Sequence, residues 1–295
     1  TMTVYTGMFI FFFVVLLSDV KITTEAFSNI FNLNNFLDVN NLAPLLTVAG
    51  TIFAYFSILI ISFGDFSRYV KNEQELKKGN LSLILNLIIF SFLSVFIVVG
   101  SDVFLNQKFS DIDRIFTNPT DIVGKFDNIQ ITIVVLFFII IASASTNLVA
   151  NFIPSQYSLI NFAPSILSLK SASYLIAFFG LLIAIFWLTI LSQIGILSFV
   201  DTFGAFFGPL FGVMAADYYL IKNQELSNKD LYSIDKESAY YYSGGWHIKG
   251  VYSLILGFIF SASTIWNTNL MFLQSYAWII GAFVAWITYY LLAKK

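Results

Sequence analysis

Residues 81–100, LSLILNLIIFSFLSVFIVVG, contain no charged side chain and are apolar on every face of a helix. A helix that crosses the hydrocarbon core of a bilayer needs about 20 such residues. A transmembrane barrel would instead show segments of about ten residues in which apolar and polar side chains alternate. The stretch therefore predicts a membrane-spanning helix and favours an all-α integral membrane protein.

The composition of the whole chain agrees with this interpretation. Its 295 residues are 58% hydrophobic and only 11% charged, whereas soluble domains are about 25% charged. No soluble domain of useful size fits into the longer polar segments at 101–129 and 222–249, so we expect residues 1–295 to form a single transmembrane domain. We predict eight spanning helices, near residues 4–19, 46–64, 80–100, 130–152, 173–190, 193–221, 250–266 and 271–292.

The distribution of positive charge predicts the orientation, because Lys and Arg collect in cytoplasmic loops. An inside amino terminus leaves only Lys21, Lys108, Arg114 and Lys125 outside the cell. The carboxy terminus is then cytoplasmic, and we expect a multi-pass protein of the plasma membrane, or of the inner membrane if the source is bacterial. Eleven basic residues lie inside in this topology: Arg68, Lys71, Lys77, Lys78, Lys170, Lys222, Lys229, Lys236, Lys249, Lys294 and Lys295.

Several function classes are disfavoured by the residues that are rare or missing. The net charge of −2, without a basic patch, argues against a nucleic-acid partner. The sequence has no cysteine for disulfide or thiol chemistry, and its one histidine, His247, leaves no His-rich metal site. A membrane-embedded enzyme is also disfavoured, because paired carboxylates are lacking at lipid depth.

A polar segment interrupts the predicted span at 130–152. Ala142, Ser145 and Thr146 are spaced i, i+3 and i+4, so they share one face of a helix. This face offers two hydroxyls and a backbone carbonyl, and oxygen ligands suit a hard cation such as sodium. The alternative is that the small residues let helices approach and the hydroxyls bond to the preceding turn. Spacing alone favours that alternative.

Asn151 follows Thr146 by five residues, which is about 140° around an ideal helix. Its amide offers two donors and one acceptor, which suits the N–H and C=O edge of a planar heterocycle. Because Pro154 follows closely, a role at the end of the helix is an equal alternative.

Aromatic and charged side chains mark the predicted span at 46–64. Tyr55 and Phe56 follow a small-residue segment at 49–51, and such rings can stack on a flat ligand or simply pack in the membrane. Asp65 and Arg68 are three residues apart and can pair on one face. A solvated helix end with ordinary cytoplasmic charge is the alternative for this pair.

The predicted span at 193–221 carries residues that disrupt helices. We expect an interrupted helix and a candidate gate there, because interrupted helices in transporters line ligand pathways. Asp201 and Asp217 fall near the two ends of the span, where we expect them to be interfacial. The disruptive residues are Gly204, Gly208, Pro209 and Gly212.

Three motifs in order resemble the nucleobase:cation symporter-1 family. They are GDFSRYVKNEQELKKGN at 64–80, ASASTNLVANFIPSQYSLINFAPSILSLKSASYLIA at 142–177 and FGPLFGVMAADYYLIKNQELSNKDLY at 207–232. The resemblance implies a LeuT-type fold of twelve helices with an inverted repeat, of which this chain would supply helices 5 to 12. It also implies missing amino-terminal helices that complete the binding sites.

The resemblance further implies roles for individual residues. Ala142, through its carbonyl, and Ser145 and Thr146, through their hydroxyls, match the family's sodium site. Asn151 matches the residue whose side-chain amide contacts the substrate in this family. Phe56 stands where the family usually has a Trp, so it keeps a stacking face without the indole N–H. His247 stands where an Asn is usual.

The expected function is a sodium-coupled symporter that carries a nucleobase-like heterocycle, such as cytosine, a purine, allantoin or a hydantoin, by alternating access. Sodium would be the coupling ion, no other cofactor is expected, and the chain is not expected to be an enzyme. Two alternatives stay open at this point. One is a membrane scaffold or truncated fragment that transports nothing, and the other is an amino-acid or amine permease of the same fold, coupled to protons or independent of sodium.

Overall fold

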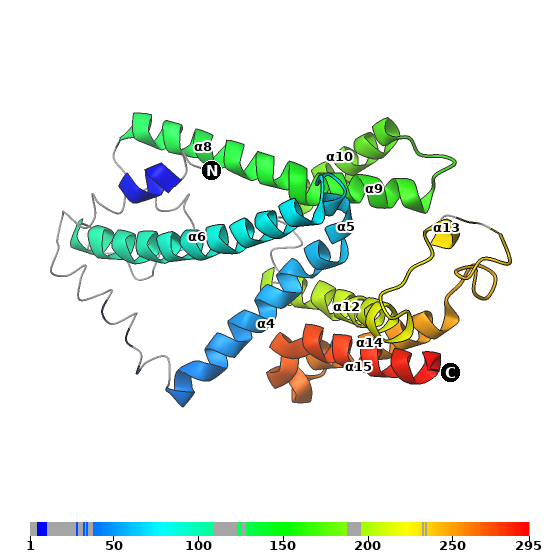
Figure 1. The fold of residues 1–295 in the computed structure, drawn as a ribbon. Coiled ribbons are helices and arrows are strands. Elements are labelled where there is room, and N and C mark those ends of the chain that lie inside the picture. Colours follow the sequence, from blue (N-terminus) through cyan, green and yellow to red (C-terminus); the bar gives the residue numbers. More distant parts are fainter. Residues whose placement is uncertain are drawn as a thin grey trace. The chain divides into compact units, whose positions relative to one another are not determined.

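The computed structural model describes residues 5–10, 28, 32, 34, 38–108, 123–124, 128–187, 196–231, 233 and 235–294. Over these residues the regular structure is helical, with one isolated bridge between Ser243 and Trp246. The elements (Figure 1) are α4 (Val39–Ile61), α5 (Phe63–Ser67), α6 (Glu73–Lys108), α8 (Ile129–Asn147), η1 (Leu148–Phe152), α9 (Ile153–Phe162), α10 (Leu169–Phe186), α12 (Ile196–Ala216), η3 (Asp217–Ile221), α13 (Asn228–Leu231), α14 (Ile248–Trp266), η4 (Thr268–Tyr276) and α15 (Ala277–Ala293).

Seven helices within the described residues are long and apolar enough to cross a membrane. Each coincides with one of the eight predicted spans, so the prediction of an all-helical, multi-pass membrane protein is confirmed for this part of the chain. The first predicted span, at 4–19, lies largely outside the described residues. The seven are Asn40–Ile61, Glu73–Gly100, Ile129–Phe162, Leu169–Phe186, Phe199–Ile221, Ile248–Trp266 and Thr268–Ala293.

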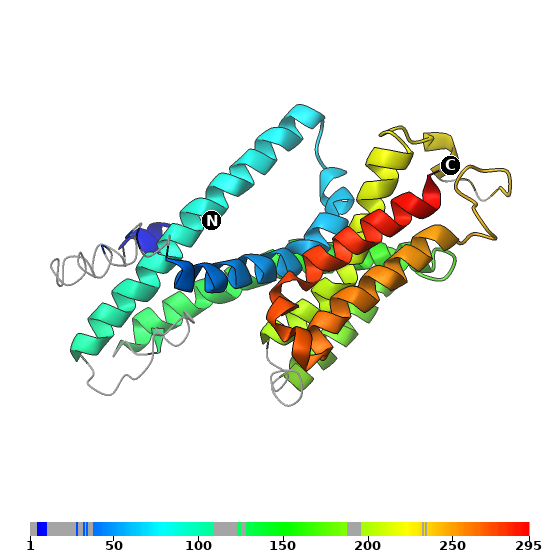
Figure 2. The ribbon, with the colours of Figure 1, turned by 90° about the horizontal axis from the view of Figure 1, so that it is seen from below.

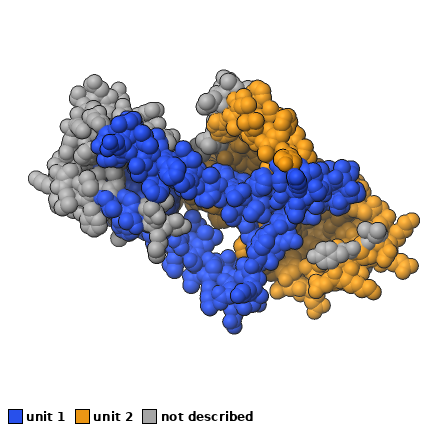
Figure 3. Space-filling view, turned by 90° about the horizontal axis from the view of Figure 1, so that it is seen from above, with its two compact units in different colours: residues 1–38, 65–173 blue, residues 39–64, 174–295 orange. Residues whose placement is uncertain are grey.

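The chain divides into two compact units, coloured separately in Figure 3. Unit 1 comprises residues 1–38 and 65–173, and unit 2 comprises residues 39–64 and 174–295. Unit 1 contains α6, α8, η1 and α9, and unit 2 contains α4 and the helices from α12 to α15.

The central feature of unit 1 is a continuous helical path from Ile129 to Phe162. It begins at Asn128, whose side-chain oxygen accepts hydrogen bonds from the backbone N–H groups of Gln130 and Ile131, each at 3.1 Å. Such an N-cap satisfies donors that the first turn of a helix leaves without partners. None of the residues of α8 is fully buried, but Val135, Leu136 and Ile139 on one face are half-buried, while most of its other apolar side chains are exposed.

The path does not end near Pro154, contrary to the alternative role for Asn151 at the end of a helix. Residues Leu148–Phe152 form a π-helical turn, in which the N–H of Ile153 bonds to the carbonyl of Leu148. Pro154 then lies in the first turn of α9, and because proline has no N–H, the path lacks one backbone hydrogen bond to the preceding turn. The helical path nevertheless continues through the proline, directly after the wider turn.

The core of unit 2 is α12, which packs against α4, α14 and α15. Figure 2 shows α14 and α15 side by side along their length, and these two helices also pack against each other. Gly204, Gly208 and Gly212 recur every four residues, so they lie on one face of α12. A Cβ at Gly204 would lie 2.5 Å from Ala54 Cβ of α4, and at Gly212 it would overlap the carbonyl oxygen of Ala282 in α15.

The prediction of an interrupted helix is therefore wrong for α12, whereas its role as a candidate gate stays a prediction. The helix is continuous from Ile196 to Ala216, through Pro209. The glycines instead form the small-residue face that membrane helices use for close approach. The regular α-helix changes only after Ala216, where η3 adopts π-helical geometry.

Pro209 is enclosed where α12, α14 and α15 meet. A Cβ at Gly281 would lie 2.8 Å from Pro209 Cδ, and one at Gly257 would lie 3.0 Å from Pro209 Cβ. A proline cannot donate to the carbonyl four residues earlier, which here is Ala205. The hydroxyl of Ser261 on α14 donates to that carbonyl at 2.6 Å. A neighbouring helix thus supplies the hydrogen bond that Pro209 removes.

Candidate functional site

The three residues of the predicted sodium site come together at the end of α8. Ser145 Oγ and Thr146 Oγ1 each donate a hydrogen bond to the carbonyl oxygen of Ala142, at 2.9 Å in both cases. The predicted sharing of one face is therefore confirmed. These bonds also fit the alternative, in which the hydroxyls bond to the preceding turn, so the geometry is compatible with both interpretations.

The donor set of this cluster fits a hard monovalent cation in part. All three groups are neutral oxygens, and each hydroxyl keeps lone pairs after it donates its hydrogen to Ala142. A hard cation takes more oxygens than these three. Ser145 and Thr146 are also exposed, so a complete site would need further oxygens and a cover. Ala142, Ser145 and Thr146 are the residues that would hold the ion.

Asn151 lies in the π-helical turn η1, directly after the hydroxyl cluster. Its Nδ2 donates to Asn147 Oδ1, and Asn147 Nδ2 donates to the carbonyl of Ser143 at 2.9 Å. The expected angle of about 140° from Thr146 assumes 3.6 residues per turn, whereas Leu148–Phe152 form a π-helical turn with more residues per turn. Asn151 is exposed, and this bond uses only one of its two amide hydrogens.

Tyr55 and Phe56 lie on α4, in unit 2, whereas Asn151 lies in unit 1. The two rings are 5.2 Å apart between centroids and meet edge to face. Tyr55 is 63% exposed and Phe56 is half-buried. One ring is thus accessible for stacking, while the other packs partly into its own unit.

The charged pair after α4 has a third member that the sequence did not indicate. Arg68 Nη1 lies 4.0 Å from Asp65 Oδ1, at the limit of an ion pair. The Arg68 guanidinium also lies 4.4 Å from the centre of the Tyr157 ring. The hydroxyls of Tyr157 and Tyr69 share a hydrogen bond, and this bond raises the pKa of Tyr69.

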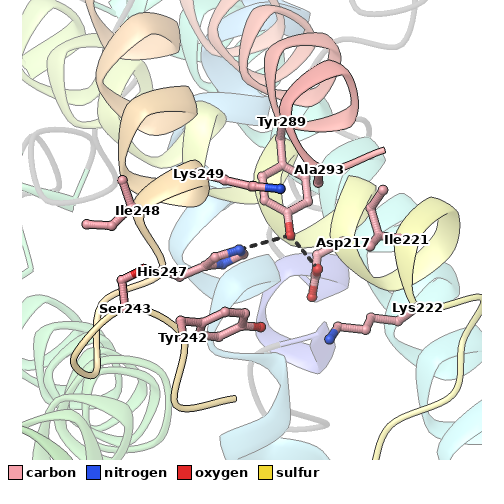
Figure 4. A pocket seen from close by; sticks show the side chains of 10 residues that line it. All are labelled: Asp217, Ile221, Lys222, Tyr242, Ser243, His247, Ile248, Lys249, Tyr289 and Ala293. Carbon is pink, nitrogen blue, oxygen red and sulfur yellow. Dashed lines mark hydrogen bonds between the residues drawn. The ribbon is translucent and has the colours of Figure 1, made fainter. Parts of the chain in front are cut away.

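A polar cavity in unit 2 is the clearest site that sequence reasoning missed (Figure 4). Its volume is about 210 Å³, and it lies where η3, α15 and the residue before α14 meet. The Tyr289 hydroxyl donates to Asp217 Oδ1 at 2.6 Å, and His247 Nε2 lies 3.3 Å from the same hydroxyl. The cavity is lined by Asp217, Ile221, Lys222, Tyr242, Ser243, His247, Ile248, Lys249, Tyr289 and Ala293.

The protonation of this cluster follows from its hydrogen bonds and its burial. Because Tyr289 gives its hydrogen to Asp217, His247 must carry a hydrogen on Nε2 to bond to Tyr289. Burial lowers the pKa of His247, although Asp217 opposes this effect. The His247 ring stacks on Tyr242 with centroids 4.0 Å apart, and burial raises the pKa of Tyr242. The cluster therefore favours a neutral imidazole.

Only part of this cluster was visible in the sequence. His247 stood out as the one histidine and Asp217 as an acid at the end of a span, but 30 residues separate them along the chain. Tyr289 carries no local signal, because it lies in an apolar helix among other aromatic residues. Only the packing of α15 against η3 brings it to Asp217.

The seven apolar helices and the polar clusters at their ends define a multi-pass membrane protein. The chain belongs to the family of permeases for cytosine/purines, uracil, thiamine and allantoin, whose family model matches residues 2–290. Members of such a family are transporters rather than enzymes.

Curated relatives carry names in agreement with the family. An allantoin permease of Bacillus subtilis is 28% identical over 82% of this chain and 48% of its own length. A purine-uracil permease of Arabidopsis thaliana is 25% identical over 82% of this chain and 41% of its own. A putative allantoin permease of Escherichia coli is 26% identical over 85% and 50%. The chain thus spans about half the length of these relatives, and no solved structure matches it.

Proposed function

We propose that the full-length protein is a sodium-coupled symporter for a nucleobase-like heterocycle, such as cytosine, a purine, allantoin or a hydantoin. The observation that carries the proposal is the convergence of the Ser145 and Thr146 hydroxyls on the Ala142 carbonyl, at 2.9 Å each. Membership of a permease family supports the substrate class. The names of the allantoin, purine-uracil and hydantoin permeases among the relatives support it further.

In this proposal, the two ends of one polar segment serve two ligands. The oxygens of Ala142, Ser145 and Thr146 hold part of the sodium shell, and further helices of a LeuT-type fold complete it. The amide of Asn151 pairs with the N–H and C=O edge of the heterocycle. Tyr55 and Phe56 offer aromatic faces for stacking.

Coupling follows from linkage between the two ligands. If sodium favours the conformer that binds substrate, substrate strengthens the binding of sodium by the same factor. Inward movement of sodium then drives uptake by alternating access around a fixed site. We place the protein in the plasma membrane, with its carboxy terminus in the cytoplasm, as the distribution of Lys and Arg indicates.

The test is uptake by the full-length protein in proteoliposomes. Radiolabelled allantoin, uracil, adenine, cytosine and hydantoin are offered with an inward sodium gradient, or with choline in place of sodium. We expect sodium to stimulate uptake of at least one heterocycle, and unlabelled amino acids not to compete. Competition by amino acids would support a permease for amino acids instead. A folded protein that transports none of these compounds would support the scaffold alternative.

A further inference from the structure

Asp201 is a buried acid within a predicted membrane span. It lies on α12, and its exposed fraction is only 4%. Thr51 of α4 and Gln274 of η4 bond to it, and it is the third residue of the apolar span Phe199–Ile221, so the expected place near a span end is retained although the side chain is buried. A buried acid within a membrane span is by default a candidate functional residue, because a carboxylate removed from water is costly to ionise unless it is paired.

The partners of Asp201 are neutral. Gln274 Nε2 of η4 donates to Asp201 Oδ2 at 2.9 Å, and Thr51 of α4 also forms a side-chain hydrogen bond with this carboxyl. None of the ion pairs in the described part of the chain includes Asp201. The only titratable side chains of α4 and η4 are Tyr55 and Tyr276, and neither perturbs Asp201. A negative charge at this position therefore has hydrogen-bond donors but no cation to balance it.

Close backbone contacts fix this arrangement. A Cβ at Gly50, next to Thr51, would overlap the carbonyl oxygen of Ser275, next to Gln274. Hence α4 and η4 approach each other directly beside the two residues that bond to Asp201. The three side chains are held by three separate elements, so any movement between α4, α12 and η4 changes the surroundings of the carboxyl.

A second buried polar group lies one helical turn away. Trp278 is 7% exposed, and its Nε1 donates no hydrogen bond within the described residues. Its Cδ1, which is bonded to Nε1, lies 3.8 Å from the ideal Cβ position of Gly204. Gly204 is three residues after Asp201 on α12 and therefore on the same side of the helix. The junction thus combines an uncompensated carboxyl with a buried donor that lacks an acceptor, which suits a small polar ligand.

We infer that Asp201 is a proton-binding site, which exchanges a proton directly with water when α4, α12 and η4 move apart beside the half-buried Gln274. The proton adds to a carboxyl oxygen and removes the charge, and no bond to carbon changes. In the neutral form, the acid can donate its hydrogen to the oxygen of Gln274 or Thr51 after these groups reorient. This inference goes beyond the proposed function, because it requires neither sodium nor a particular heterocycle.

Infrared difference spectroscopy of the full-length protein in lipid nanodiscs tests this inference. Between acidic and alkaline pH, we expect a carbonyl-stretch band of a protonated carboxylic acid that disappears as the pH rises. Asp201→Asn should abolish this band, since its amide keeps the size of the side chain but cannot titrate. Asp217→Asn is the matched control, because it removes the other aspartate of the same helical path and should leave the band intact.

A second variant covers the case in which Asp201→Asn does not fold. Gln274→Leu keeps the carboxyl but removes a donor that stabilises its charged form, so the band should persist to a higher pH. A band that survives in Asp201→Asn would overturn the inference. So would the absence of any titrating band in the parent, or a titration that Gln274→Leu leaves unchanged. None of these readouts depends on transport, so failure of the symporter proposal would be seen separately.

Discussion

Ser261 donates a 2.6 Å hydrogen bond to the carbonyl of Ala205 across two helices, at the position where Pro209 removes the normal donor. Ser261 is fully buried, so water does not replace this bond. The same helices approach closely around Pro209, where α14 and α15 contribute Gly257 and Gly281. The proline is therefore compatible with a continuous, central α12 because α14 supplies a hydroxyl at one position.

Ser261→Ala should destabilise the protein by about 1–3 kcal/mol, the cost of a buried carbonyl without a donor. Ser263→Ala is the matched control, because Ser263 is only partly buried and its hydroxyl bonds to Phe260 in its own helix, at 2.7 Å. Thermal unfolding of both purified variants, followed in detergent, gives the comparison. Equal melting temperatures for the two variants would show that the bond to Ala205 carries no special weight.

Gly212→Ala should destabilise unit 2, because the added methyl group would overlap the Ala282 carbonyl oxygen. Overpacking of this kind costs about 1–3 kcal/mol. Gly180→Ala on α10 is the control, since a Cβ there meets nothing within 4 Å and alanine is the better helix former. We expect a clear loss of folded protein on size-exclusion chromatography for Gly212→Ala and none for Gly180→Ala. Similar profiles would contradict the close packing of α12 on α15.

Acidification should destabilise the His247 cluster. The pKa of His247 is lowered in the folded protein by burial, so the unfolded chain binds the proton more readily. The contribution of a neutral His247 is fully present above the ordinary histidine pKa of about 6.5 and declines as the pH falls below it. As the pH is lowered from 8 to roughly 5, the melting temperature of the parent protein should fall. That of His247→Asn should fall less steeply. Parallel curves for the two proteins would contradict this assignment.

Ser145→Ala and Thr146→Ala should weaken the dependence of uptake on sodium concentration in the full-length protein. Each removes one of the oxygens that converge on Ala142, and we expect the sodium concentration for half-maximal uptake to rise about tenfold, which corresponds to roughly 1.4 kcal/mol. Ser143→Ala is the control, because residue 143 lies about 100° around the helix from Ala142. An unchanged sodium response in both variants, with normal protein yield, would show that the hydroxyls only pack.

The sequence predicted the spans well, because membrane helices need long apolar runs that local composition reveals. It also predicted the meeting of Ser145 and Thr146 with Ala142, since their spacing alone sets a shared face. It failed where geometry departs from the ideal helix, as in the π-helical turn before Pro154.

Features that depend on tertiary packing were also missed. Gly204 and Gly212 predicted an interrupted helix, but α4 and α15 use them for close approach. The burial of Asp201 depends on η4, which lies more than 60 residues further along the chain. The contact of Tyr289 with Asp217 has the same origin. Pairings of this kind leave no local pattern in a single sequence.

Asn151→Leu should lower substrate affinity in the full-length protein by about tenfold or more, because an unpaired polar edge in a dry pocket costs roughly 1–3 kcal/mol. Asn147→Leu is the matched control, since it breaks the same amide bond to Asn151 from the other side. If Asn151 contacts the substrate, its replacement lowers affinity more than that of Asn147, while both variants melt at similar temperatures. Phe56→Trp should be tolerated, because it preserves an aromatic face for stacking. Affinity is measured at saturating sodium, and equal affinities for parent and Asn151→Leu would restrict Asn151 to its bond within the π-helical turn.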